Sequence, residues 1–233
     1  MSKVPELSAE EIQARVLHRD GLMLVIDKPA GLPVHRGPKG GPNLESSFES
    51  LRFGLPRPPV LAHRLDRDTS GCLVLGRHRK ATASLGLLFK HGKISKTYWA
   101  IVEGAPAEGE GTIDMPLGRR NAERGWWQKV DPEGQSAVTN WKVMGRGGDF
   151  TWLALEPVTG RTHQLRVHAA ALAWPIVGDN IYGNGPRSGE PRLHLHSREI
   201  VIPISRNKDP VRVTAPVPPH MQERLRLCGW RDE

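Results

Sequence analysis

Short apolar or β-favouring runs, separated by turn-rich polar segments, dominate the pattern of this chain. Such runs predict strands when they are bounded by Gly, Pro or charged residues. The predicted strands cover residues 22–26, 71–76, 96–102, 200–204 and 211–214. Val138–Val143 and Phe150–Leu155 flank the glycine-rich segment 145–149, which predicts a β-hairpin. Residues 104–111 predict a linker between two of these elements.

Helical spacing is confined to a few segments. The predicted helices cover residues 80–91, 162–174 and 218–228. Gly92 is expected to end the first of them, and Thr162 to cap the second. Residues 1–20 predict an N-terminal extension, with a helix starting near Ala9, ahead of one main domain over 21–233. Strands and helices alternate irregularly, so we expect an α+β fold with a mixed, largely antiparallel central sheet and flanking helices and loops.

Length and composition limit the protein class. The 233 residues suffice for one substantial core or two closely joined subdomains. No apolar run approaches the roughly 18 residues that cross a bilayer, and no secretory signal begins the chain. Two cysteines give no disulfide framework. We therefore expect a monomeric cytoplasmic protein with no membrane partner.

The positive charge is concentrated in one part of the chain. The net charge is +8, and residues 63–102 alone carry eight Lys and Arg against two Asp and Glu, a net of +6. Such a stretch is typical of a phosphate-binding surface, because each neutralised phosphate releases counterions. A solvated basic face is the other interpretation, and composition does not decide between the two.

The segment from His63 to Gly71 holds five ionisable residues within six positions, between apolar residues and a predicted strand. Asp66 has arginines two positions before it and one after it, which would favour its ionised form if they approach it in space. An ionised carboxylate serves as nucleophile or general base. Asp68 and Thr69 are better explained by turn chemistry. For Asp66, both a turn and a functional role remain open on the pattern alone.

A second polar cluster lies at residues 160–168, where Arg161, His163, Gln164 and Arg166 crowd the first turns of a predicted helix. Either arginine could pair with a carboxylate or a phosphate. A surface helix whose polar side chains face water is the alternative. Apolar residues on both sides of Arg166 favour a packed arginine, and buried arginines usually have anionic partners.

Other chemistries find weaker support. The pair His194 and His196 could share a strand face, but no zinc-binding spacing occurs, so no metal site is expected. Cys72 lies in an apolar strand and is expected to be core rather than a nucleophile. Tyr98, in the basic stretch, could stack on a base or be an ordinary strand aromatic. Trp126 and Trp127, near Arg119, Arg120 and Arg124, could meet RNA or anchor a loop.

Four segments together resemble the motifs of the RluA-type pseudouridine synthase family. They are Asp27-Lys28-Pro29-Ala30-Gly31-Leu32-Pro33-Val34-His35, His63 to Gly71, Lys96-Thr97-Tyr98-Trp99-Ala100, and Gly160 to His168 continuing through Pro175-Ile176-Val177-Gly178-Asp179 to Tyr182-Gly183. Their order and spacing also agree, from about residue 20 to 215. Four motifs in register are far more specific than any one of them.

The resemblance implies an isomerase that needs no cofactor and no metal, with an active-site cleft across the sheet and residues 21–233 as its catalytic domain. The target uridine would be flipped into the cleft. Asp66 would start cleavage of the glycosidic bond, Arg166 would pair with it, and Tyr98 would stack on the uracil. Arg64 would fill the gap left by the flipped base. The RNA-binding residues implied by the resemblance are Arg64, His63, Arg67, Lys28, Arg161 and Gln164.

The family often carries a small RNA-binding domain before the catalytic part, whereas only about 20 residues precede the first motif here. We expect the substrate to be a stem-loop of tRNA or ribosomal RNA, chosen through loops 36–43 and 119–129. Two other functions are compatible with parts of the pattern. A non-catalytic RNA-binding or RNA-folding module would not need the set Asp66, Tyr98 and Arg166. A hydrolase using Asp66 and Asp68 lacks accompanying metal ligands.

Overall fold

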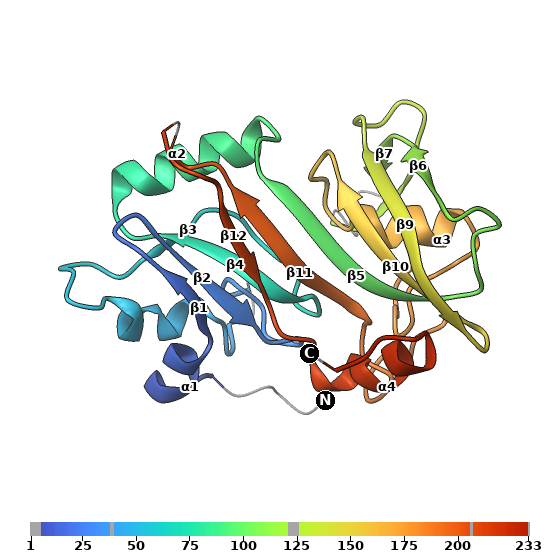
Figure 1. Cartoon of the computed structure of the whole chain (residues 1–233), viewed down its shortest axis with the longest axis horizontal. Helices are drawn as coiled ribbons and strands as arrows, with labels where there is room; N and C mark the ends of the chain where they lie inside the picture. Colours follow the sequence, from blue (N-terminus) through green and yellow to red (C-terminus); the bar gives the residue numbers. More distant parts are fainter. Residues whose placement is uncertain (1–5, 38–39, 121–125, 206, 233) are drawn as a thin grey trace. The chain divides into compact units, whose positions relative to one another are not determined.

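The computed structural model describes residues 6–37, 40–120, 126–205 and 207–232. The chain folds into two compact units. Unit 1 comprises residues 1–96 and 197–216, and unit 2 comprises residues 97–196 and 217–233. Strands β5 (Ser95–Glu103) and β11 (Leu195–Ile202) each begin in one unit and end in the other (Figure 1).

Unit 1 contains a largely antiparallel set of strands together with helices. Its further elements are α1 (Ala9–Ala14), β1 (Val16–Arg19), β2 (Met23–Lys28), the 3-10 helix η1 (Glu45–Leu51), β3 (Val60–Leu61), β4 (Ser70–Gly76), α2 (Arg79–Lys90) and β12 (Val211–Thr214). The sheet order is β1-β2-β4-β11, with β3 paired to β4 and β12 to β11. The pairs β1·β2, β2·β4, β3·β4 and β11·β12 are antiparallel.

The core of unit 1 lies between this sheet and α2. Alternate residues of each strand face one side, so Val25 of β2 and Val74 of β4 join Leu85 of α2 in one buried cluster. His78 caps α2, and Gly92, with φ of 63°, follows its last turn as predicted. Cys72 is fully buried in the same cluster, and burial raises the pKa of its thiol to about 12, which confirms its assignment to the core.

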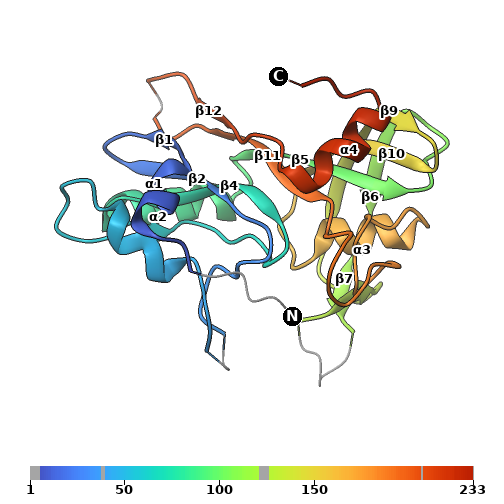
Figure 2. The ribbon, with the colours of Figure 1, turned by 90° about the horizontal axis from the view of Figure 1, so that it is seen from below.

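Unit 2 contains four antiparallel strands in the order β5-β10-β9-β6, which belong to the same ten-stranded sheet as those of unit 1, and a small hairpin. Its further elements are β6 (Glu110–Asp114), β7 (Leu117–Arg119), β8 (Gln128–Val130), β9 (Val138–Gly147), β10 (Phe150–Pro157), α3 (Gln164–Ala171) and α4 (Pro219–Leu227). Strands β7 and β8 form the hairpin. Helix α4 lies against the ends of β9 and β10 in both ribbon views (Figures 1 and 2). The predicted α+β class with a largely antiparallel sheet is confirmed.

Close backbone packing explains two glycines of β9. A Cβ on Gly145 would lie 1.8 Å from the carbonyl oxygen of Cys228, and one on Gly147 would lie 2.0 Å from that of Leu227. The strand therefore accepts the end of α4 only because it carries no side chain at these positions. The predicted five-residue connection of the hairpin was too long, since the strands extend to Gly147 and leave only Gly148 and Asp149 between them.

Other expected boundaries differ in detail. The segment 104–111, predicted to be a linker, already contains the start of β6 at Glu110. Thr162 was wrongly predicted to cap α3, because the N-cap is His163, held in the left-handed region with φ of 55°. None of the helices in the described part of the chain is long and apolar enough to cross a membrane.

Candidate functional site

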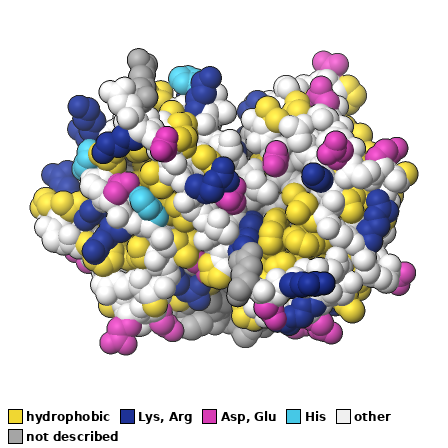
Figure 3. Space-filling view, viewed as in Figure 1, with side chains coloured by type: hydrophobic (Ala, Val, Ile, Leu, Met, Phe, Trp, Pro, Cys, Tyr) yellow, Lys and Arg dark blue, Asp and Glu magenta, His cyan; other side chains and the backbone are white. Residues whose placement is uncertain are grey.

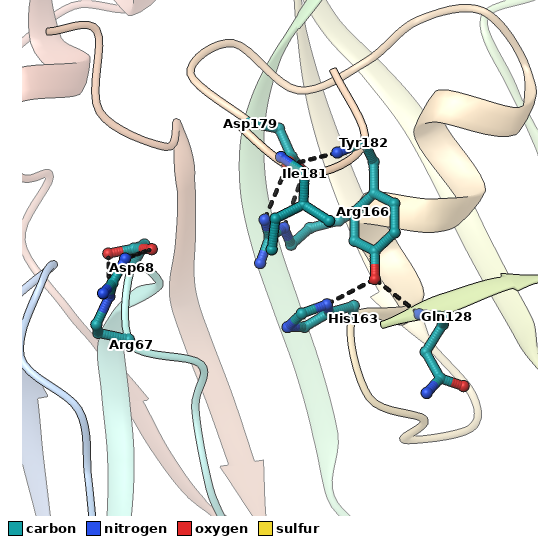
Figure 4. A network of polar contacts seen from close by, with 8 residues as sticks. All are labelled: Arg67, Asp68, Gln128, His163, Arg166, Asp179, Ile181 and Tyr182. Carbon is teal, nitrogen blue, oxygen red and sulfur yellow. Dashed lines mark hydrogen bonds and ion pairs between the residues drawn. The ribbon is translucent and has the colours of Figure 1, made fainter. Parts of the chain in front are cut away.

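The loop that carries Asp66 runs from His63 to Thr69, between β3 and β4 of unit 1. Asp66 is half-buried, Arg64 and Arg67 are exposed, and Asp68 is paired with Arg67. The Arg67 guanidinium donates from Nε and Nη2 to the two carboxylate oxygens of Asp68, at 3.0 Å each (Figure 4). The backbone N–H of Thr69 donates to the carbonyl of Asp66 at 3.2 Å, which confirms the predicted turn at Asp68 and Thr69.

Lys28 stabilises this loop through hydrogen bonds to its backbone. It is fully buried, and its ammonium donates to the carbonyl oxygens of Pro29, Arg67 and Thr69 at 2.8, 2.8 and 2.9 Å. Gly31 adds a backbone N–H to the carbonyl of Arg67 at 2.9 Å. Burial lowers the pKa of Lys28 to about 7, against the opposing influence of Asp68 and Asp66. All three ammonium protons are thus engaged within the protein, and the expected RNA contact of Lys28 stays a prediction.

His63 anchors the start of the loop. Its Nε2 accepts the backbone N–H of Val74 at 3.0 Å, and its ring stacks on Phe89 of α2 with centroids 4.2 Å apart. Burial lowers the pKa of His63 to about 3, and the charge of Lys96 acts in the same direction. The imidazole is therefore neutral at physiological pH and fixed by β4 and α2, which leaves Arg64 and Arg67 as the exposed cations of this loop.

Arg166 is the central side chain of the second cluster, in unit 2. Its Nε and Nη2 donate to the two carboxylate oxygens of Asp179 at 2.8 Å each, and both side chains are buried (Figure 4). Asp179 Oδ1 also accepts the backbone N–H groups of Ile181 and Tyr182, at 2.9 and 3.1 Å. Burial works against ionisation of Asp179, but Arg166 and these amides outweigh it and lower the pKa of the carboxyl.

Tyr182 extends this cluster. The Arg166 guanidinium carbon lies 5.3 Å from the centroid of its ring, and its hydroxyl lies 2.7 Å from Nδ1 of His163. The same hydroxyl accepts the backbone N–H of Gln128 at 2.9 Å. The sequence pattern gave no role to Asp179 or Tyr182. A detectable signal was present, because a packed arginine requires an anion and Asp179 follows the apolar run 175–177 and Gly178, only 13 residues further on.

Gln164 and His168 form a buried polar network beneath this cluster. Gln164 Oε1 accepts from the Thr159 hydroxyl and the Arg161 backbone, while its Nε2 donates to the carbonyl of Val138 and the hydroxyl of Thr139. The Thr139 hydroxyl then donates to Nδ1 of His168, whose Nε2–H donates to a carbonyl. Gln164 is buried and its amide is fully engaged by protein groups, and its expected RNA contact stays a prediction.

The remaining candidates lie on different parts of unit 2. Tyr98 is half-buried on β5, opposite Leu155 of β10, and packs against the core of unit 2. Arg161 is exposed, and its Nε donates to the carbonyl of Ser136. Trp126 is 58% exposed and packs edge-to-face on His163. Parts of the expected substrate loops, residues 38–39 and 121–125 with Arg124, lie outside the described residues.

The candidate residues therefore fall into two groups, one in each unit. Lys28, His63, Arg64, Asp66 and Arg67 belong to unit 1, and Tyr98, Arg161, Gln164 and Arg166 belong to unit 2. The implied pairing of Arg166 with Asp66 joins residues of different units and stays a prediction. Nowhere in the described ranges do three or more His, Cys, Asp or Glu residues form a cluster that could hold a metal ion.

Comparison with known proteins identifies the family. A family model described as RNA pseudouridylate synthase matches residues 22–171. An RNA pseudouridine synthase of Zymomonas mobilis is 45% identical over 206 residues, which cover 88% of this chain and 94% of that protein. The ribosomal large subunit pseudouridine synthase D of Xanthomonas campestris is 37% identical, over 93% of this chain and 70% of that protein.

A solved structure agrees with these matches. Human RNA pseudouridylate synthase domain containing 4 has a TM-score of 0.79 and 27% identity, and the match covers 94% of this chain and 95% of that chain. The similarity thus extends over nearly the whole length of both proteins, well beyond the motifs. The chain belongs to the RluA-type family of RNA pseudouridine synthases and is an RNA-modifying isomerase.

Proposed function

We propose that this protein isomerises specific uridines in tRNA or ribosomal RNA, with Asp66 as the residue that starts the reaction. The observation that carries the proposal is the construction of the loop from His63 to Thr69. Lys28 fills its interior and His63 fixes its start, so that Asp66 is held half-buried on a rigid frame beside exposed Arg64. A reactive carboxylate needs such preorganisation by residues that do not themselves react.

The reaction breaks the bond between N1 of uracil and C1′ of ribose. The target nucleotide is flipped out of its stack, at a cost of a few kcal/mol, and Arg64 occupies the space that it leaves. Asp66 acts as nucleophile or base in the cleavage. The detached uracil rotates, C5 bonds to C1′, the proton on C5 leaves, and N1 gains a proton. Atoms therefore balance without a cofactor, and the loss of the C5 proton is a measurable product of turnover.

Arg166 and Tyr98 complete the proposed site. Arg166 pairs with Asp66, while Asp179 holds the guanidinium through its Nε and Nη2. Tyr98 stacks on the uracil and assists removal of the C5 proton. Arg67 and Arg161, both exposed, contact the RNA backbone. Lys28, His63 and Gln164 support these residues through buried hydrogen bonds instead of touching RNA.

The substrate class rests on the same family membership. The Xanthomonas relative is named for the ribosomal large subunit. We propose residues 21–233 as the catalytic domain, acting as a cytoplasmic monomer, with loops 36–43 and 119–129 selecting the RNA. Pseudouridine mapping of total RNA from cells with and without the protein tests activity and identifies the modified position at once.

Asp66→Asn tests the chemistry. It retains size and hydrogen-bonding capacity but removes the negative charge. We expect no tritium release from RNA labelled at C5 of uridine, with RNA binding retained. Normal tritium release by this variant would remove Asp66 from the mechanism. Asp68→Asn is the matched control in the same turn, and its turnover is expected to remain close to that of the wild type.

A further inference from the structure

Helix α2 lies in a part of the chain without acidic residues, since no Asp or Glu occurs between Asp68 and Glu103. Arg79 and Lys80 lie in the first turn of the helix, Lys90 ends it, and Lys93 follows shortly after. These four side chains, the α2 cations, are all exposed. In the space-filling view, Lys, Arg and His side chains gather over the part of unit 1 where α2 lies (Figure 3).

The α2 cations differ from many other exposed cations of the protein. Arg67, Arg192 and Arg226 pair with Asp68, Glu190 and Asp232, respectively. Across the described residues, by contrast, the side chains of the α2 cations make no ion pair or hydrogen bond. Exposed charges without protein partners remain available to a ligand of opposite charge.

The positions of Arg79 and Lys80 are not explained by helix stability. The N-terminus of a helix favours negative side chains, by about 0.3–1 kcal/mol each, and cations there act in the opposite direction. The first turn of α2 contains no acidic residue. The cap is His78, whose Nδ1 accepts the backbone N–H of Ala81 at 3.2 Å. Two cations at this end therefore weaken the helix slightly, which suggests that they serve a contact outside the protein.

Helix α2 is attached directly to the loop that carries Asp66. Phe89 of α2 stacks on His63, the first residue of that loop, with an interplanar angle of 24°. The charge of Lys96, half-buried after the same helix, adds to the effect of burial in lowering the pKa of His63. The cationic face and the proposed catalytic loop are thus parts of one packed assembly within unit 1.

We propose that the exposed face of α2 is a docking surface for the sugar-phosphate backbone of RNA beside the target uridine, an inference that rests on the proposed function. The 12 residues of α2 span about 18 Å, so its two basic ends contact phosphates several nucleotides apart. Ala83, Ser84 and Leu87 are exposed between those ends. None of them stacks on bases, so the surface contributes affinity and orientation without reading sequence.

The test compares two variants that lose the same charge. The first replaces the α2 cations: Arg79→Gln, Lys80→Gln, Lys90→Gln and Lys93→Gln. The control replaces four other exposed cations: Lys142→Gln, Arg146→Gln, Arg212→Gln and Arg231→Gln. Affinity for unfractionated tRNA is measured from 50 to 300 mM salt, and initial rates are measured on the RNA identified by mapping. Thermal unfolding verifies that both variants are folded.

The α2 variant is expected to lose at least about tenfold in affinity, with a salt slope smaller by about 3, because each lost phosphate contact removes nearly one unit of slope. Its KM rises to a similar extent, whereas kcat at saturating RNA changes less than twofold. The control variant should lose much less. Equal losses in the two variants would reduce the effect to net charge and overturn the proposal, as would unchanged affinity in the α2 variant. Failure of the wild type to form pseudouridine would instead contradict the proposed function, while the affinity comparison still tests α2.

Discussion

The Arg166 guanidinium and the Asp179 carboxylate form a two-point ion pair with side-chain exposures of only 4% and 1%. The segment containing Asp179 also closes on itself, because the same carboxylate accepts the backbone N–H groups of Ile181 and Tyr182. The pair therefore fixes the direction of the arginine and the fold of residues 179–182 together. A planar guanidinium suits this task better than an ammonium, since its two parallel N–H groups match the carboxylate.

Asp179→Asn is expected to destabilise the protein by about 3–5 kcal/mol at pH 7, because it leaves the Arg166 charge buried without its anion. Urea unfolding measures this difference. The control is Asp232→Asn, which breaks the exposed pair with Arg226 and should cost less than about 1 kcal/mol. Equal effects of the two substitutions would contradict the importance assigned to the buried pair.

The same substitution has a pH signature. The folded-state pKa of Asp179 is lowered, so its ionisation stabilises the fold. That contribution is fully present above the unfolded value of about 3.9 and is lost as the pH falls through the lower folded-state value. The stability difference between the wild type and Asp179→Asn is therefore expected to be constant from pH 7 to 5 and to shrink below pH 4. If the stability difference between the two proteins instead grew as the pH fell, the lowered folded-state pKa of Asp179 would be contradicted.

Gly178→Ala is expected to distort the backbone next to the segment 179–182. Gly178 has φ of 78°, and a Cβ there would lie 2.1 Å from the carbonyl oxygen of Arg192. The substitution therefore adds a backbone clash to the strain of a left-handed alanine, and we expect a lower Tm together with reduced turnover. Gly148→Ala is the control, because Gly148 has φ of 59° with open space around it and carries only the strain, about 1 kcal/mol.

The strands that the sequence predicted well are those with a strong local pattern. Residues 71–76 fall within β4 and residues 211–214 coincide with β12, because each is a short run bounded by turn residues. Strands β1 and β3 were missed. They are only four and two residues long, and β1 is at best half-buried, so partner strands rather than their own composition determine them.

The sequence indicated which residues belong to the site, but it indicated less well what each of them contacts. Charge density drew attention to the loop at Asp66, and packing to Arg166. Lys28 and Gln164 were expected to contact RNA, although both are buried and donate to protein oxygens. A sequence states that a side chain is polar, whereas only the fold shows whether its protons point outward. The partner Asp179 was given no role from the sequence, because its pairing depends on the turn at 179–182 that brings it to Arg166.

Both cysteines are expected to resist alkylation in the native protein. Cys72 is fully buried with a thiol pKa raised to about 12, and burial also raises the pKa of Cys228, which is 3% exposed. The reactive thiolate is therefore scarce and inaccessible. Iodoacetamide at pH 8 should label neither thiol and should leave turnover unchanged, while protein unfolded in urea should take up two labels. Rapid labelling of native Cys72 would contradict the core of unit 1 as described.

Lys28→Met tests the hydrogen bonds that hold the loop carrying Asp66. Methionine has a similar length and no charge, so it fills the space but leaves the carbonyls of Pro29 and Thr69 without the ammonium donor, whereas that of Arg67 keeps the N–H of Gly31. Each carbonyl left unsatisfied costs about 1–3 kcal/mol, offset in part because a buried charge is removed. We expect a folded protein of lower stability whose kcat falls by at least tenfold while its KM for RNA changes little, since Lys28 acts on the loop and not on the substrate. Lys142→Met, on the exposed face of β9, is the control and should alter neither quantity. A rise in KM at constant kcat would instead assign Lys28 to RNA binding, as the family resemblance first implied.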